Sequence, residues 1–134
     1  MGTEKVIILP CFCGQSNVGV TTTLAALEAV EEVGLDKVGI STLAVIALFP
    51  DKMKSELDKA KKIISIDGCS GVCAKTLIER TGVKTTHNIV LTEDIGMENR
   101  ALDVEVGKKK DIRQHLEEEV KKAKELIVKA ILEE

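Results

Sequence analysis

All four cysteines of the chain follow directly after two short apolar runs, and this placement restricts the fold more than any other feature. The runs are residues 6–9 and 63–66. Cys11 and Cys13 follow the first run, and Cys69 and Cys73 follow the second. Apolar runs without polar alternation are typical of strands buried on both faces of a parallel sheet. Two such strands in one sheet would carry both cysteine pairs to its carboxyl edge, where open α/β folds bind their ligands.

The remaining pattern alternates between strand-like and helix-like segments. Strands are predicted at residues 5–9, 37–42, 63–66 and 87–91, with an alternating edge strand at 102–106. Helices are predicted from a cap at Thr21, Thr22 or Thr23 to Val33, and at about 51–61, 70–80 and 109–132. Residues 43–48 fit either the end of a strand or a short buried helical turn.

This alternation predicts an α/β fold: a single-domain three-layer sandwich over residues 1–134, with helices on both faces of a mostly parallel sheet of four or five strands. A chain of 134 residues with 44% apolar content can bury one such core. In the first helix, Leu24, Leu27 and Val30 are expected to face that core. The long C-terminal helix repeats apolar residues at helical spacing, at Ile112, Leu116, Val120, Ala123, Ile127 and Ala130 or Ile131.

Composition argues against two classes of partner. The formal charge is −3, from 22 acidic and 19 basic residues, so no basic excess attracts nucleic acid or an anionic membrane surface. Tyr and Trp are absent, which removes the aromatic platforms on which bases stack. The first apolar run is too short for a signal peptide or a membrane span. We therefore expect a cytoplasmic protein that binds neither nucleic acid nor membrane.

Four clustered cysteines in a reducing compartment favour a metal or catalytic role over disulfides. Cys69 is expected to open the helix that contains Cys73, and residues four apart lie on one helical face, so both sulfurs could point to one place. Four thiolates about 2.3 Å from one ion form the usual structural zinc site. The spacing differs from the C-x2-C pairs of zinc ribbons, so the joint placement of the pairs carries this hypothesis.

On these residues the chain resembles the DGC-domain family, small proteins described as zinc-binding. The family signature is a strand that ends in Asp-Gly-Cys, here residues 67–69, before a helix with a second Cys and a Lys, here Cys73 and Lys75. An early Cys-Gly turn leads to a Ser-Asn-Val-Gly loop, here residues 16–19. The resemblance covers about residues 5–92 and implies a zinc site rather than a particular reaction.

One position departs from the family pattern. Family members often place a further cysteine before a Leu-Ala pair, where this chain has Thr42. The resemblance therefore leaves open which of Cys11 and Cys13 is the family ligand. Asp67 either accepts a bond from the amides of the cysteine turn or lies beside the metal, or it only forms a good Asp-Gly turn. Lys75 either lowers the pKa of a nearby thiol or is simply exposed.

A second motif overlaps the first cysteine turn. Residues 14–21 have the glycine spacing and final Thr of a P-loop, but Val20 occupies the position of the lysine that reaches the outer phosphates. ATP hydrolysis is therefore not expected. A glycine loop at a helix start still offers amides to a small anionic ligand. The candidate anion-binding residues are Gly14, Ser16, Asn17, Gly19 and Thr21.

The two histidines are expected to be structural, His87 at the opposite edge of the sheet and His115 on the surface of the last helix. The leading hypothesis is a zinc site at Cys11, Cys13, Cys69 and Cys73, structural or for metal delivery. One alternative is a thiol redox enzyme with Cys69 as nucleophile. Iron-sulfur binding and a non-catalytic interaction module are the others. Whether the chain is an enzyme, and its oligomeric state, stay open.

Overall fold

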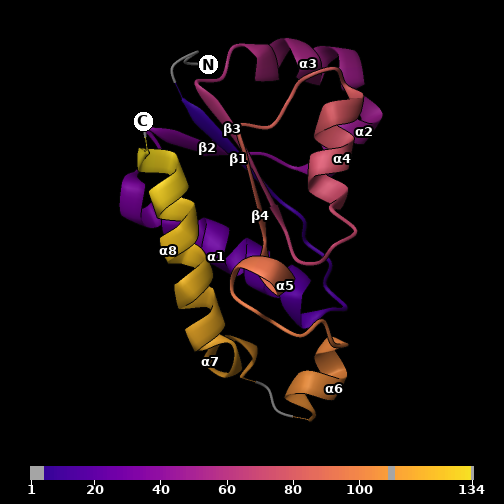
Figure 1. The fold of residues 1–134 in the computed structure, drawn as a ribbon, viewed down its shortest axis with the longest axis vertical. Helices are drawn as coiled ribbons and strands as arrows, with labels where there is room; N and C mark the ends of the chain where they lie inside the picture. The colour runs from indigo at the N-terminus through magenta and orange to yellow at the C-terminus, as the bar shows by residue number, and fades with distance from the viewer. Residues whose placement is uncertain (1–4, 109–110, 134) are drawn as a thin grey trace.

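The two apolar runs form neighbouring central strands of a four-stranded parallel sheet (Figure 1). The computed structural model describes residues 5–108 and 111–133. The strands of the sheet are β1 (Val6–Pro10), β2 (Val38–Ile40), β3 (Lys62–Asp67) and β4 (His87–Val90). Their order across the sheet is β2-β1-β3-β4, and each neighbouring pair is parallel. The predicted α/β class and parallel sheet are confirmed, with four strands.

Burial on both faces explains why β1 and β3 lack polar alternation. Ile8, Ile64 and Ile66 point into one hydrophobic cluster, whereas Ile7, Leu9 and Ile63 point into another. Successive side chains of a strand point to opposite faces, so each face needs its own set of apolar residues. Ser65 is the polar exception in the middle of β3, and it is fully buried.

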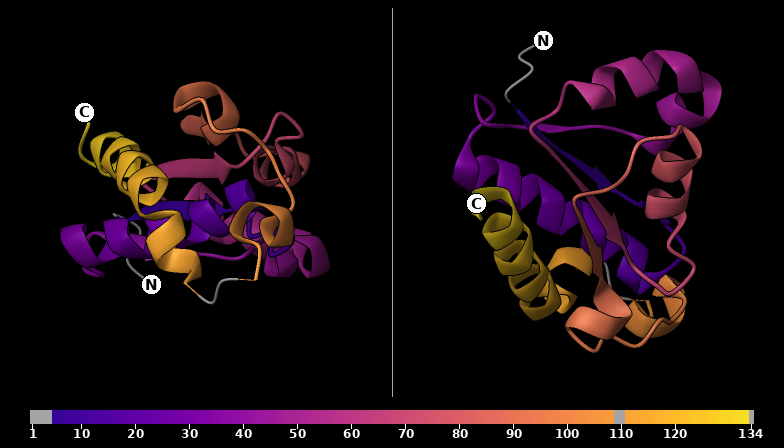
Figure 2. Two further views of the ribbon diagram at one scale, coloured as in Figure 1. Left: turned by 90° about the horizontal axis from the view of Figure 1, so that it is seen from below. Right: turned by 45° about the horizontal axis from the view of Figure 1, so that its top comes forward.

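Helices cover both faces of the sheet, as the sequence predicts (Figure 2). One face carries α1 (Asn17–Val33) and α8 (Glu117–Leu132), which pack against each other. The other face carries α2 (Leu43–Leu48), α3 (Pro50–Asp58) and α4 (Cys73–Arg80). The segment 43–48, which the sequence left open, is therefore a helix. No helix within residues 5–108 and 111–133 has both the length and the apolar character to span a bilayer.

The strand order creates a topological switch point between β1 and β3. From β1 the chain crosses through α1 to β2 on one side, and from β2 it crosses back through α2 and α3 to β3 on the other side. The two connections leave the sheet in opposite directions. In open α/β sheets, ligands bind in the crevice at the carboxyl ends of the strands where this happens.

Several predicted helix boundaries are wrong. α1 begins at Asn17 and is capped by Ser16, five or more residues before the predicted cap. Leu27 is 44% exposed, because the buried side of α1 is lined with the small residues Ala25, Ala26 and Ala29. Small side chains let α1 approach both the sheet and α8 closely. The prediction that Leu27 faces the core is therefore wrong.

The C-terminal third also differs from the prediction. Residues predicted as an edge strand form α6 (Leu102–Val106), because Leu102 and Val106 also share one face of a helical turn. The predicted helix 109–132 is divided into α7 (Ile112–His115) and α8 by a break at Leu116. Its first two residues lie outside the described part of the chain. A further short helix, α5 (Leu91–Asp94), follows β4 directly and includes Leu91, which was predicted to end the strand.

Candidate functional site

The two cysteine turns leave the sheet side by side. β1 and β3 end in register, with Pro10 opposite Ile66. The N–H of Cys11 then donates a hydrogen bond of 2.8 Å to the carbonyl of Ile66. This bond fixes the start of the first cysteine turn to the end of the strand that leads into the second. Both turns therefore begin at the switch point of the sheet.

The first turn is held against the start of α1 by a close backbone approach. A Cβ at Gly19 would lie 2.4–2.6 Å from backbone and Cβ atoms of Cys13, so only glycine fits there. The hydroxyl of Thr22 donates a hydrogen bond of 2.8 Å to the carbonyl of Cys11. Cys11 is half-buried and Cys13 is exposed. The backbone of this turn is thus fixed by α1, while the Cys13 side chain remains accessible.

The second turn touches the same helix start. A Cβ at Gly68 would lie 2.8 Å from Cγ2 of Val18. Gly68 follows the last residue of β3, and Val18 is in the first turn of α1. The N-terminus of α1 therefore contacts both cysteine turns, and glycine allows the contact on each side.

Asp67 is buried and connects the end of β3 to the start of α4. Its carboxylate accepts hydrogen bonds from the backbone N–H groups of Ala74, at 2.8 Å, and Lys75, at 3.2 Å. The side-chain amide of Asn88 donates a third bond of 3.1 Å to it. Asp67 is 1% exposed, so these bonds to an anionic acceptor are shielded from water. The two backbone donors belong to the first turn of α4 rather than to the turn before it, and they hold α4 in place.

Cys69 and Cys73 lie on either side of Gly71 in the sequence, and their arrangement differs from the predicted one. The prediction that Cys69 opens the helix is wrong, because α4 begins at Cys73 and Cys69 lies in the preceding turn. A Cβ at Gly71 would lie 3.5 Å from Sγ of Cys69 and 3.9 Å from Sγ of Cys73. Val72 makes this turn possible by adopting φ +42°, a left-handed conformation that is unfavourable for a β-branched residue.

Burial and nearby negative charges disfavour the thiolate form of Cys11. Burial of Cys11 and, to a smaller extent, nearby negative charges together raise the pKa of its thiol to about 12. These charges are those of Asp67, Cys73, Cys13 and Cys69. Without a cation, Cys11 therefore keeps its proton near neutral pH. A bound metal ion reverses this effect, because it attracts the negative charges that otherwise repel one another.

The four thiols are ligands of the kind that zinc prefers, but the structure does not gather them around one point. All four cysteines are free. Within residues 5–108 and 111–133, no group of three or more His, Cys, Asp or Glu side chains has the arrangement of a metal centre. Cys13 and Cys73 are exposed, so their side chains can turn inward. Ion binding at this edge would therefore require the thiols to close around the ion.

The predicted anion-binding loop already uses its amides within the chain. The N–H of Gly19 donates to Oγ of Ser16 at 3.0 Å, and the N–H of Val18 donates to Oδ1 of Asn17 at 2.8 Å. The backbone N–H of Asn17 donates to the carbonyl of Arg100, and the hydroxyl of Thr21 donates to the carbonyl of Asn17. An anion would have to displace these bonds, so the anion site, including Gly14, stays a prediction that this geometry does not favour.

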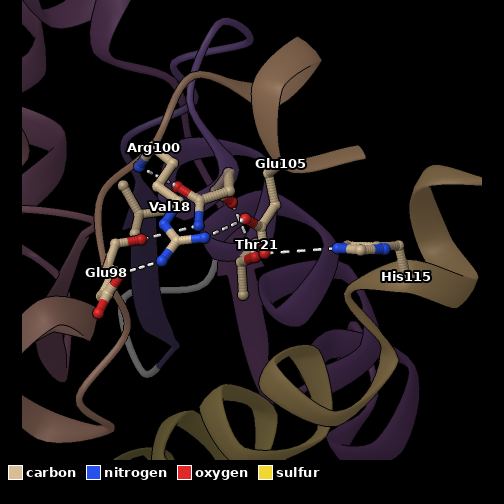
Figure 3. A network of polar contacts seen from close by, with 7 residues as sticks. Val18, Thr21, Glu98, Arg100, Glu105 and His115 are labelled. Atoms are coloured by element: carbon tan, nitrogen blue, oxygen red, sulfur yellow. Dashed lines mark hydrogen bonds and ion pairs between the residues drawn. The ribbon is translucent and has the colours of Figure 1, made fainter. Parts of the chain in front are cut away.

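The remaining candidate residues lie away from the thiols or face other partners. His87 begins β4, at the amino edge of the sheet as predicted, with its Nε2 3.7 Å from a carboxylate oxygen of Glu133. His115 is not freely exposed, because its Nε2 lies 3.4 Å from Glu105 (Figure 3). Nζ of Lys75 lies 4.0 Å from Glu79, whereas its backbone N–H bonds to Asp67.

Two buried or half-buried polar residues near Asp67, Ser65 and Asn88, were not predicted from the sequence. The amide of Asn88 in β4 donates to Oγ of Ser65 in β3 at 2.7 Å as well as to Asp67. Ser65 and Asn88 are register partners in the parallel ladder. The available signal was the presence of polar residues within two otherwise apolar strands, since buried polar groups need partners.

Comparisons with known proteins identify one similarity. A family model described as DGC domain matches residues 7–127. The match includes both cysteine turns and extends well beyond residue 92, through α6 and most of α8. No curated protein and no solved structure matches the chain.

Proposed function

The chain belongs to the DGC domain family, and we propose that it binds a zinc ion through its two cysteine turns. The ligands would be Cys69, Cys73 and at least one of Cys11 and Cys13. One observation carries the proposal: both turns leave adjacent parallel strands at the topological switch point, joined by the bond from Cys11 to Ile66. The ion would be structural or held for delivery.

The chemistry of the site supports this proposal in two ways. Thiolates are preferred ligands of zinc and other soft metals. Asp67, buried beside the turns, adds negative charge without being free to ligate, because three donors already occupy its carboxylate. If only three thiolates bind, zinc supplies a Lewis acid with an open position. Such a site needs reduced cysteines, so the proposal places the protein in the reducing cytoplasm.

The decisive experiment is elemental analysis of protein purified under reducing conditions without added metal, paired with a count of free thiols. We expect about one zinc per chain and slower alkylation of the cysteines when zinc is bound. Cys69→Ser should lower the zinc content, whereas the neighbouring change Ser70→Ala should not. A wild-type chain that contains no zinc, and takes up none on titration, would refute the proposal.

A second candidate function is thiol redox chemistry at Cys69 and Cys73. Their sulfurs would lie 3.5 Å and 3.9 Å from a Cβ at Gly71, and Cys73 is exposed. In such a reaction the two thiols would be oxidised to one disulfide while a disulfide co-substrate is reduced to two thiols. Metal-free protein with one thiol alkylated far faster than the others would favour this function over zinc binding.

The same preparations separate the last two alternatives. An iron-sulfur cluster would give a brown protein with visible absorption, which zinc does not give. An interaction module would keep its fold and its partners after Cys69→Ser. In either case the zinc content measured above would be low.

A further inference from the structure

A segment from the last third of the chain lies against the loop that carries Cys13. We call residues 98–102 the strap. Ser16 and Ala101 form an isolated antiparallel bridge. The N–H of Leu102 donates to the carbonyl of Gln15 at 2.8 Å, and the N–H of Asn17 donates to the carbonyl of Arg100 at 3.0 Å. The strap and the loop are therefore joined by backbone bonds across more than eighty positions of sequence.

The side chain of Asn17 is the inner anchor of this contact. It is 3% exposed. Its amide Nδ2 donates to the carbonyl of Glu98, and its Oδ1 accepts from the N–H of Arg100, both at 2.8 Å. The same Oδ1 accepts from the N–H of Val18 in the first turn of α1. One buried amide thus connects the start of α1 to two backbone positions of the strap.

The outer side of the strap carries ion pairs instead (Figure 3). The guanidinium of Arg100 contacts the carboxylates of Glu98 and Glu105, and Glu105 contacts His115. The Arg100 and Glu98 side chains are half-exposed or more. Exposed ion pairs contribute little to stability, so the buried bonds of Asn17 hold the strap more strongly than this outer layer does.

We propose that Asn17 is a positioning residue for the Cys11–Cys13 turn and acts through the strap. Gly19 fixes the backbone of Cys13 against α1, and Asn17 fixes the same turn of α1 to the strap. Residues 11–16, by contrast, belong to no helix or strand between β1 and α1. Loss of the anchor therefore loosens the first turn of α1 and the residues before it that carry Cys13, whereas the second cysteine turn keeps its own bonds to Asp67. The consequence for metal rests on the proposed zinc site.

The anchor is tested first without metal. Asn17→Asp keeps an acceptor for the two N–H groups but replaces the donor to Glu98 by an oxygen. Glu98→Gln is the matched control, since it changes a strap side chain and leaves the carbonyl that Asn17 contacts. In hydrogen exchange of metal-free protein, Asn17→Asp should speed exchange of the amides of residues 15–19 by about tenfold or more. Exchange in α4, and in the control, should stay near wild type.

The second measurement is zinc affinity by competition with a chromogenic chelator. Asn17→Asp should weaken zinc binding by about tenfold, and Glu98→Gln should change it by less than about twofold. Unchanged exchange, or faster exchange with unchanged zinc affinity, would overturn the positioning role. If wild-type protein binds no zinc, the proposed function fails, and the exchange experiment still decides whether Asn17 anchors the turn.

A further variant keeps the test valid if Asn17→Asp does not fold. Leu102→Pro removes the N–H that bonds to Gln15 at the first position of α6, where proline is tolerated. Leu102→Ala is its control, because it removes the same packing and keeps the N–H. Faster exchange in residues 15–19 of the proline variant alone supports the strap, and equal exchange in both variants argues against it.

Discussion

The carboxylate of Asp67, at the end of β3, accepts a hydrogen bond of 2.8 Å from the backbone N–H of Ala74, in the first turn of α4. The intervening turn contains Cys69 and Cys73. This bond joins the two ends of the turn, which are seven residues apart in the sequence. The conformation of the segment that carries both thiols therefore depends on the buried carboxylate of Asp67. The buried acid of the Asp-Gly-Cys segment therefore fixes the turn that carries Cys69 and Cys73.

Asp67→Asn should destabilise the protein, although the two side chains have nearly the same size and shape. The amide offers an NH2 group where the carboxylate accepts from Lys75 and Asn88, so at least one buried donor loses its partner. We expect a loss of about 1–3 kcal/mol in the free energy of unfolding, measured by chemical denaturation. Asp103→Asn, at an exposed site in α6, is the control and should stay within about 0.5 kcal/mol of wild type.

Gly19→Ala should destabilise the protein, whereas alanine normally stabilises a helix relative to glycine. The new Cβ would lie within 2.4–2.6 Å of Cys13, two of whose contacted atoms belong to the backbone and cannot move freely. We expect a loss of about 1–3 kcal/mol. In Gly14→Ala the nearest atom is 3.2 Å away, at the tip of the exposed Phe12 ring, so this variant should remain close to wild type. Equal effects would contradict the close approach.

At Val72 a glycine variant should be more stable than an alanine variant, which is the reverse of the order expected inside a helix. At a left-handed position glycine is favoured over alanine by about 1 kcal/mol, whereas inside a helix the preference is opposite. Val72→Gly should therefore be more stable than Val72→Ala, while Thr76→Gly, in α4, should be less stable than Thr76→Ala. Thermal melts of the four variants check both orders. Alanine preferred at both sites would show that Val72 is not held at positive φ.

The stability of the metal-free protein should depend on Cys11 at alkaline pH. The pKa of this thiol is raised from 9.0 to about 12, so the folded state holds the proton more tightly than the unfolded chain does. This contribution to stability is fully present below about pH 9 and is lost as pH rises towards 12. Between about pH 8 and pH 10.5, wild type should lose more unfolding free energy than Cys11→Ala. Chemical denaturation under reducing conditions at each pH measures this difference. If the unfolding free energies of both proteins fall equally with pH, Cys11 makes no such contribution.

Local patterns predicted the parts of the site that depend on burial alone. The runs that became β1 and β3 had to be strands covered on both faces, because neither contains a regular polar alternation. From that, the placement of Cys11 and Cys69 at one edge of a parallel sheet follows. The turn between Cys69 and Cys73 was expected to be helical, but the structure forms it with Val72 at positive φ, which no propensity indicates, since valine normally avoids that region.

The errors came from segments whose partners lie far away in the sequence. Residues 102–106 alternate like a strand, yet they form α6, because Leu102 can pack against the core while Val104 points to solvent. The start of α1 was placed too late because Ser16 and Asn17 look like loop residues. Asn17 is fixed as the first residue of the helix by its bonds to the strap, and no local pattern reveals a contact with Glu98 and Arg100.

The sequence by itself determined that this chain forms a parallel α/β sheet with thiols after two of its strands, because burial on both faces and turn chemistry are properties of neighbouring residues. Only the tertiary structure decided that β1 lies beside β3, that α1 contacts both cysteine turns, and that the strap holds the first of them. These features depend on contacts between segments far apart in the chain, whose free energy comes from packing and hydrogen bonds that exist only once the whole sheet is assembled.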